Sequence, residues 1–238
     1  MVGGGGEEGS YLGSFVRCGY CAKLVPMLKF LLWNLNKKPL QDSIAALARR
    51  HDVDVIVLLE NAVPPRQMLQ TLNPPGTADY FFSPGRLCDK IHIFTKFSDI
   101  FIQPVEEFSR LTIRHLKLPG RADILLAAIH FPSKVYWSDD SQAHECTILA
   151  DQIIEVEQRY GHARTVLLGD LNMNPYEAGI ISVRGLNATM STRIAQRQNR
   201  VVQSRGYPFF YNPMWGLFGN GANGPAATYY YENSEHKV

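Results

Sequence analysis

The sequence predicts a single domain in which helices and β-strands are mixed, and three kinds of pattern lead to that prediction. Several uninterrupted apolar runs end abruptly, as buried strands do. Other runs alternate apolar and polar residues, as half-buried antiparallel strands do. Two segments repeat apolar residues at the spacing of an amphipathic helix. A chain of 238 residues, 45% of them hydrophobic, is long enough to bury one sizeable core.

The first 26 residues are predicted to be a flexible tail that precedes the domain. Residues 1–22 are rich in glycine and have no apolar periodicity. Met27 then opens the first strand, whose sequence is MLKFLLWNL. We therefore expect the domain to span residues 27–238, with Met27 as the natural start and residues 1–26 dispensable for folding.

Up to residue 72 the predicted strands and helices alternate along the chain, and from residue 90 to residue 119 antiparallel strands follow. Ile44, Leu47 and Ala48 share one face of the first helix, and two prolines open the second. In chain order after the first strand, the predicted elements are a helix at 40–52, a buried strand at 53–60, a short helix at 64–72, and antiparallel strands within 90–97, 99–108 and 111–119.

The second half is predicted to contain a buried strand at 122–131, a long helix at 139–160 and a buried strand at 163–172. The long helix has the strongest pattern, because Ser138 and Asp139 can cap its start and Gly161 can end it. Its apolar stripe consists of Leu149, Ile153, Val156 and Tyr160. From residue 185 onward the patterns weaken, and we predict a loop with one strand.

Charge and cysteine content exclude some classes of protein. The 24 basic and 22 acidic residues give a net charge of +2, which indicates neither nucleic-acid nor membrane-surface binding. Cys18 and Cys21 form a C-x-x-C pair, but no second pair follows, as a structural zinc site usually requires. With Cys88 and Cys146 they are predicted to be free thiols in a reducing cytoplasmic compartment. No signal peptide is evident and no apolar run is long enough to span a bilayer, so no membrane span is predicted.

Polar side chains follow four of the apolar runs at the point where each run ends. Asn34 ends FLLWN, Glu60 ends VIVLLE, His130 ends LAAIH and Asp170 ends VLLGD. Strand ends that converge share one rim, and ligands often bind at such a rim. Carboxylate and amide oxygens suit a hard cation such as Mg²⁺, which binds one or two carboxylates and several waters.

Asn172 lies two residues beyond Asp170, so the alternation of a strand would place both side chains on one face. Each residue also has an ordinary structural explanation when it is taken alone. Asn34 suits a turn, Glu60 an exposed strand end, His130 the core or rim, and Asp170 a helix cap. The joint order, with each group on its own strand, favours a site.

The motifs at these strand ends resemble those of the endonuclease/exonuclease/phosphatase superfamily, whose fold is also called DNase I-like. The matching motifs are LLWNLN at 31–36, VIVLLE at 55–60, AAIHFPSK at 127–134 and GDLNMNP at 169–175. The resemblance implies an α+β fold, a four-layer αββα sandwich in which two mixed sheets pack face to face between helices. The two longer predicted helices would then cover the outer faces.

The resemblance also implies hydrolysis of phosphate esters with Mg²⁺ or Mn²⁺, as in phosphodiesterases, nucleases and phosphatases. Members act on DNA and RNA backbones, abasic sites, inositol phosphates or sphingomyelin. By this resemblance Glu60 would be the principal metal carboxylate, with Asn34 beside it on the metal or a bound water. His130 would contact the scissile phosphate, Asp170 would orient or deprotonate the attacking water, and Asn172 would hold the phosphate or Asp170.

The end of the chain departs from the superfamily pattern. Members carry a later strand with an Asp that supports a catalytic His, and a closing strand with a Ser-Asp-His motif. Here Ser234, Glu235 and His236 mimic that motif but follow ATYYY directly, without room for the strand before it. We therefore expect a chain that stops before two catalytic strands, with the strand around residues 29–34 lacking a neighbour and with little hydrolytic activity.

Two main hypotheses about function follow. The first is a metal-dependent phosphodiesterase, and the second is a non-catalytic binding or scaffold version of the same fold; a generic α/β sandwich with polar rim residues by chance is a third. The substrate is expected to be a phosphate ester, with nucleic acid among the candidates, because FFYNPMW supplies aromatic rings and RQNRVVQSR supplies Arg197, Arg200 and Arg205. The alternative for RQNRVVQSR is the solvated face of a helix. The sequence indicates no protein partner.

Overall fold

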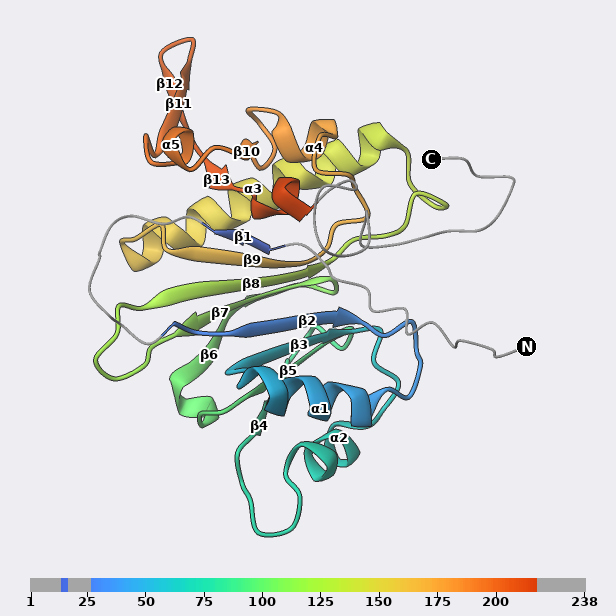
Figure 1. Ribbon diagram of the computed structural model, residues 1–238. Helices are drawn as coiled ribbons and strands as arrows, with labels where there is room; N and C mark the ends of the chain where they lie inside the picture. Colours follow the sequence, from blue (N-terminus) through green and yellow to red (C-terminus); the bar gives the residue numbers. More distant parts are fainter. Residues whose placement is uncertain (1–13, 17–26, 218–238) are drawn as a thin grey trace.

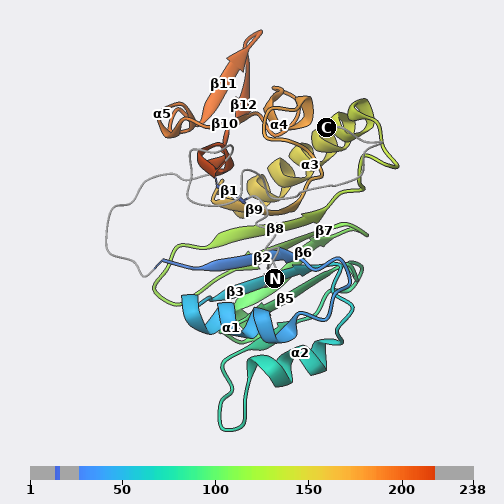
Figure 2. The same cartoon turned by 45° about the vertical axis from the view of Figure 1, so that its right-hand side comes forward.

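A computed structural model of the chain describes residues 14–16 and 27–217, in which two β-sheets pack face to face (Figure 1). Helices cover the outer face of each sheet, and both views show the same order of layers (Figures 1 and 2). This arrangement confirms the predicted α+β class and the four-layer αββα sandwich.

The larger sheet consists of β1 (Ser14–Val16), β6 (Ile102–Glu107), β7 (Leu111–Leu116), β8 (Ile124–His130), β9 (Thr165–Asp170), β10 (Ala188–Thr189) and β13 (Phe210–Tyr211). Its spatial order is β10-β13-β1-β9-β8-β7-β6. β8 and β9 are parallel neighbours, and β6, β7 and β8 are antiparallel to one another in turn. The sheet is therefore mixed, with a parallel pair near its centre.

The smaller sheet consists of β2 (Phe30–Asn34), β3 (Val55–Leu59), β4 (Phe81–Ser83) and β5 (Ile91–Thr95), in the order β2-β3-β5-β4. β2 and β3 are parallel, and the other two pairs are antiparallel. Within the described residues β2 pairs only with β3, so β2 is an edge strand. A short 3₁₀ helix, η1 (Asp99–Phe101), precedes β6.

Three apolar clusters separate the layers and explain why the strands read as uninterrupted apolar runs. In β3, Val55, Val57 and Leu59 pack between the sheets, whereas Ile56 and Leu58 pack under the helices α1 (Gln41–His51) and α2 (Pro65–Leu72). The outer face of the larger sheet is covered by α3 (Asp139–Tyr160) and α4 (Ala178–Ile181). A strand buried on both faces is therefore mostly apolar, and polar residues are favoured at its ends.

The ends of α3 are those that the sequence predicts. The Ser138 hydroxyl accepts a hydrogen bond from the Ser141 backbone N–H at 3.2 Å, and Gly161 follows the helix in the left-handed conformation with φ 70°. The side chains of Leu149 and Ile153 are buried against the larger sheet. The helices predicted at 40–52 and 64–72 are likewise confirmed as α1 and α2.

The region after residue 177 is more ordered than predicted. It contains α4, β10, α5 (Thr192–Ala195), β11 (Asn199–Val202), β12 (Arg205–Pro208), β13 and the 3₁₀ helix η2 (Pro213–Leu217). For residues 185–217 the prediction of a loop with one strand was therefore wrong, whereas residues 218–238 lie outside the described residues. The helical alternative for 197–205 was wrong too, because β11 and β12 form an antiparallel hairpin joined by Gln203 and Ser204.

Some predictions fall at or beyond the limits of the described residues. Of the predicted tail, Ser14–Val16 form β1 between β9 and β13, and the domain boundary at residue 26 stays a prediction. Cys88 and Cys146 are buried free thiols, whereas Cys18, Cys21 and His236 lie outside the described residues. Within the part of the chain that is described, no helix is both long enough and apolar enough to cross a membrane.

Candidate functional site

The structure brings Asn34, Glu60, His130 and Asp170 together at one rim, where two strands of each sheet end. β2 ends at Asn34 and runs parallel to β3, and Glu60 is the residue after β3. β8 ends at His130 and β9 ends at Asp170, and these two residues are register partners. Because parallel strands end on the same side of a sheet, each sheet delivers a neighbouring pair of polar groups to the rim.

The side-chain amide of Asn34 joins the two carboxylates of the rim. Its Nδ2 donates to Oδ2 of Asp170 at 3.0 Å and to Oε1 of Glu60 at 3.4 Å. The backbone N–H of Asn36 donates to Oδ1 of Asn34 at 3.0 Å, which turns Nδ2 toward the carboxylates. The two hydrogens of one amide thus hold carboxylates that come from different sheets.

His130 lies against Glu60 and is nearly excluded from solvent. Its Nε2 is 3.3 Å from Oε1 of Glu60. Burial lowers the pKa of His130 below its ordinary value, although the charges of Asp170 and Glu60 act in the opposite direction. Burial therefore favours the uncharged form of the ring. Its Nδ1 is buried and has no hydrogen-bond partner among the described residues, so a bound molecule or water could supply one.

Asp170 and Asn172 are connected, but not by the alternation of a strand. β9 ends at Asp170, and Asn172 has a left-handed backbone with φ 51°, so the predicted reason for their proximity was wrong. A tight turn connects them instead, because the Asn172 backbone N–H donates to Oδ1 of Asp170 at 3.0 Å. The Asn172 side chain donates from Nδ2 to the Phe131 carbonyl at 2.8 Å, which ties this turn to the end of β8.

The backbone of Glu60 is strained where it enters the rim. Its φ is 48°, a value that residues other than glycine rarely adopt. The loop after β2 holds it there, since the backbone N–H of Lys37 donates to the Glu60 carbonyl at 3.0 Å. Such strain costs about 1–3 kcal/mol and persists only where surrounding contacts fix it, often at functional sites.

Gly169 sets the spacing between the two strands that carry His130 and Asp170. A Cβ atom at this position would lie 2.1 Å from the carbonyl oxygen of Ile129 on β8 and 2.4 Å from its side chain. No larger residue fits without separating the strands. The glycine of GDLN is therefore required by the packing of β9 on β8, next to the register pair of the rim.

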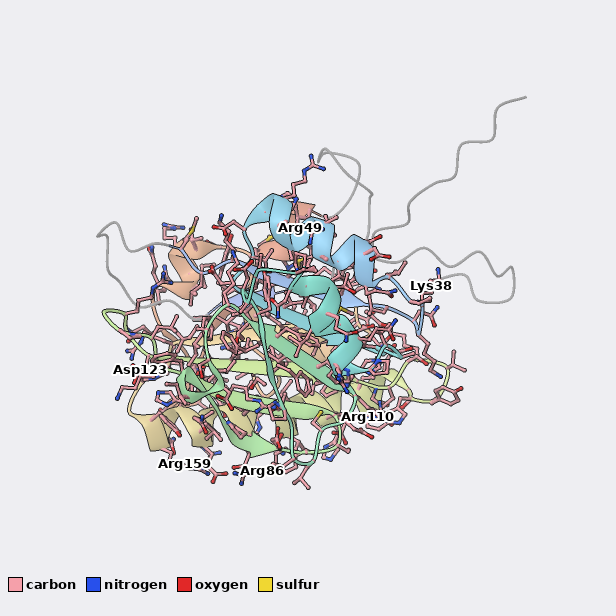
Figure 3. The ribbon with its side chains drawn as sticks, turned by 90° about the horizontal axis from the view of Figure 1, so that it is seen from below. Lys38, Arg49, Arg86, Arg110, Asp123 and Arg159 are labelled. Atoms are coloured by element: carbon pink, nitrogen blue, oxygen red, sulfur yellow. The ribbon has the colours of Figure 1, made fainter. Side chains whose placement is uncertain are left out.

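Arg110 and Gln142 support the rim, and the sequence analysis missed both. The His130 backbone N–H donates to the Arg110 carbonyl at 2.9 Å, and Nη1 of Arg110 donates to the His130 carbonyl at 3.4 Å. Buried Gln142 of α3 donates from Nε2 to the Asn172 carbonyl at 3.1 Å. The sequence could have indicated Gln142, because it is a polar residue on the same helix face as the apolar Leu149. Figure 3 shows Arg110 on the same side of the view as Lys38.

A buried ion pair fastens a loop of the smaller sheet to the larger one. Nη2 of Arg114 lies 2.9 Å from Oε1 of Glu107, and both side chains are almost completely buried. Oε2 of Glu107 accepts the backbone N–H groups of Arg86 at 2.6 Å and Leu87 at 3.2 Å, while Nη1 of Arg114 donates to the Pro84 carbonyl at 3.0 Å. Because this pairing links segments distant in sequence, no local pattern could predict it.

The rim offers oxygen donors that fit a hard cation only in part. Glu60 and Asp170 supply two carboxylates, which suits an ion that keeps several waters. The Asn34 amide faces both carboxylates with its donor Nδ2, while its Oδ1 accepts from the Asn36 backbone N–H. Among the described residues, however, no group of three or more His, Cys, Asp or Glu side chains is placed to hold a metal ion. The rim thus fits a cation bound by few side chains and by water, and not one enclosed by protein ligands.

Comparisons with known proteins give structural matches only. The sequence matches no family model and no curated protein. Similar solved structures include TDP2 from Caenorhabditis elegans, with 16% identity, a TM-score of 0.44, and coverage of 63% of this chain and 49% of that one. The chain thus spans about half the length of that TDP2.

Two further structures come from Bacteroides thetaiotaomicron. An endonuclease/exonuclease/phosphatase family protein is 15% identical, with a TM-score of 0.43 and coverage of 59% and 56% of the two chains. A mannosyl-6-phosphatase is 13% identical, with a TM-score of 0.49 and coverage of 67% and 72%. These TM-scores are below 0.5, so they carry no argument about the fold. The αββα layers observed in this chain are the evidence for the fold that the superfamily resemblance implied.

Proposed function

We propose that the chain hydrolyses phosphate esters at the rim formed by Asn34, Glu60, His130 and Asp170, with a divalent cation bound next to Glu60. One observation carries the proposal: a single amide, that of Asn34, hydrogen-bonds carboxylates from both sheets while His130 lies against one of them. Cation ligands, a proton acceptor and a phosphate-contacting ring are then within reach of one bound group.

The residues have distinct roles in this proposal. Glu60 would hold Mg²⁺ or Mn²⁺, with Asn34 as its hydrogen-bonding neighbour beside the ion or a bound water. When bound, the ion neutralises charge on a phosphoryl group and lowers the pKa of its water. Asp170 takes the proton from the attacking water, and its orientation is fixed by hydrogen bonds to both of its oxygens. His130 contacts the scissile phosphate. Asn172 keeps Asp170 in place through its backbone N–H.

A non-catalytic version of the fold is the second candidate, and one observation favours it. Both oxygens of Asp170 accept hydrogen bonds from the protein itself, so the rim is largely satisfied without a ligand. A binding or scaffold protein needs no more than this. The two candidates differ in whether the chain turns over any phosphate ester.

The test is a substrate panel measured with Mg²⁺ and with Mn²⁺. The panel contains a monoester, a diester, an inositol phosphate, an oligonucleotide and sphingomyelin, which cover phosphatase, phosphodiesterase, nuclease and phospholipase chemistry. We expect hydrolysis of at least one of them that stops when the metal is chelated. Hydrolysis of none would support the non-catalytic candidate and overturn the proposal.

Glu60→Gln tests the cation site separately from turnover. It removes the charge that holds the ion, so Mn²⁺ binding measured by calorimetry should weaken and hydrolysis should be lost. Asp123→Asn is the matched control, because Asp123 pairs with His115 and lies away from the rim. Equal Mn²⁺ affinity in the wild type and in Glu60→Gln would place the ion elsewhere.

A further inference from the structure

We propose that the hairpin of β11 and β12, called here the arginine ribbon and comprising residues 199–208, is a docking surface for the phosphate backbone of nucleic acid. The surface is separate from the rim, and its binding does not depend on the proposed hydrolysis. Figures 1 and 2 both show the ribbon projecting from the layer that covers the larger sheet, beyond α4 and α5.

The first observation is an asymmetry of charge that the net value conceals. Residues 178–217 contain five arginines and no lysine, aspartate or glutamate. The rest of the chain then has 19 basic residues against all 22 acidic ones, so its net charge is negative. The excess of positive over negative charge thus comes from one continuous segment, as expected of a surface that meets a polyanion.

The second observation is that these arginines are available. They are exposed, and within the described residues none of them has an ion-pair partner. One precedes β10, one is in α5, one lies before β11, and two are in the ribbon. In that order they are Arg184, Arg193, Arg197, Arg200 and Arg205.

The pairing of the ribbon places its arginines on one face. Arg200 is opposite Tyr207, and Val202 is opposite Arg205. Opposed residues of an antiparallel pair share a face, and positions two apart along a strand share it too. Arg200, Val202, Arg205 and Tyr207 therefore lie on one side, and the other side carries no charged residue.

The ribbon is anchored to the body of the protein at its base. Buried Asn187 donates from Nδ2 to the carbonyls of Tyr207 at 3.1 Å and Pro208 at 3.2 Å. The Phe209 backbone N–H donates to the Gln198 carbonyl at 2.9 Å. The arginine-bearing face consequently has a defined orientation relative to the larger sheet, as a docking surface requires.

The chemistry favours nucleic acid over an anionic membrane. Arginine forks match the two free oxygens of a phosphodiester, and a two-stranded ribbon fits the major groove of a duplex. The tip of the ribbon is Gln203 and Ser204, and the exposed apolar side chains beside it, Val201 and Val202, lie on opposite faces of the ribbon and so do not form one broad apolar face. Membrane-surface segments instead combine basic residues with a broad apolar face.

The test measures binding of fluorescein-labelled oligonucleotides by anisotropy, in chelator, so that no hydrolysis occurs. Duplex and single-stranded probes of equal length show which form supplies the phosphodiesters. We compare wild type with Arg200→Gln/Arg205→Gln, and with the matched control Arg49→Gln/Arg50→Gln, which removes equal charge from the exposed end of α1. Circular dichroism verifies that all variants fold.

We expect the ribbon variant to bind about tenfold more weakly, with the slope of log affinity against log salt smaller by about two, because two phosphate contacts are lost. The control should change affinity less than about twofold. Arg200→Lys/Arg205→Lys should keep the wild-type salt slope. Equal affinity of the wild type and the ribbon variant, absence of oligonucleotide binding, or binding to phosphatidylserine vesicles alone would overturn the proposal. Loss of hydrolysis at the rim leaves this measurement unaffected.

Discussion

At the rim the polar side chains hold one another in place, whereas on the arginine ribbon they do not. Asn34 hydrogen-bonds both Glu60 and Asp170, and His130 lies against Glu60. The exposed guanidinium groups of Arg200 and Arg205 have no ion-pair partner among the described residues. In the two proposals this difference matters, because hydrolysis requires groups in a fixed geometry, whereas binding of a polyanion requires unpaired charge that the partner can neutralise.

Of the substitutions that test this contrast between the rim and the ribbon, Asp170→Asn is expected to have the largest effect. Removing the proton acceptor should lower the rate of phosphate-ester hydrolysis by about three orders of magnitude. Oligonucleotide affinity in chelator should stay unchanged, since the ribbon is separate from the rim. Steady-state kinetics and anisotropy on the same preparation measure both quantities. A near-wild-type rate would remove Asp170 from the proposed mechanism.

The next effect contrasts the same substitution in the buried ion pair between β6 and β7 and on the ribbon. Arg114→Met leaves Glu107 as an unpaired buried carboxylate and should lower the free energy of unfolding by about 3–5 kcal/mol. Arg205→Met, on the exposed ribbon, should change it by less than about 0.5 kcal/mol. Urea titration compares the two variants. Similar losses would mean that the ribbon arginine has structural partners.

A smaller effect on stability is expected from a change of pH, because burial holds the pKa of His130 below its ordinary value of 6.5. Between the pKa of His130 in the folded protein and 6.5, the unfolded chain binds more protons than the folded chain does. The free energy of unfolding therefore rises with pH across this window and decreases as the pH falls through it. Thermal melts at about pH 7 and about pH 5 should show a smaller loss in His130→Asn than in the wild type. The exposed His144→Asn is the control, and an equal loss in wild type and His130→Asn would contradict the assignment.

The smallest effect concerns the turn of the ribbon. Gln203 and Ser204 both have positive φ, 48° and 63°, where Asn followed by Gly is favoured. Gln203→Asn/Ser204→Gly should therefore raise the free energy of unfolding by about 0.5–1 kcal/mol. Chemical denaturation measures this gain. No gain would show that the ribbon unfolds independently of the core.

The elements that the sequence predicts well are those with long patterns and conventional ends. The bounds of α3 follow from Ser138, Gly161 and a stripe repeated over many turns. The four rim residues follow from the positions where buried apolar runs stop. Each of these signals is local, so tertiary context changes it little.

The elements that the sequence does not predict have either short patterns or unusual turns. α4 and α5 have four residues each and β10 and β13 have two, which is too short for any periodicity. The ribbon was missed because Gln203 and Ser204 do not form a typical hairpin turn pair. Arg110 and the Glu107–Arg114 pair act through contacts between strands or sheets. Such contacts leave no trace in a window of neighbouring residues.

The spacing at Gly169 has a consequence for the inheritance of the GDLN motif. The carbonyl of Ile129 leaves no room for a side chain at Gly169, whereas Asp170 accepts hydrogen bonds from Asn34 and Asn172 at the rim. Under the proposed function, a descendant that lost hydrolysis could exchange Asp170 but would still have to keep Gly169, because the packing of β9 on β8 would be unchanged. The glycine of the motif is thus required by the packing of two strands, and the aspartate by the proposed reaction. Under the same proposal, relatives that keep the glycine and vary its neighbour would retain the strand packing without the proton acceptor.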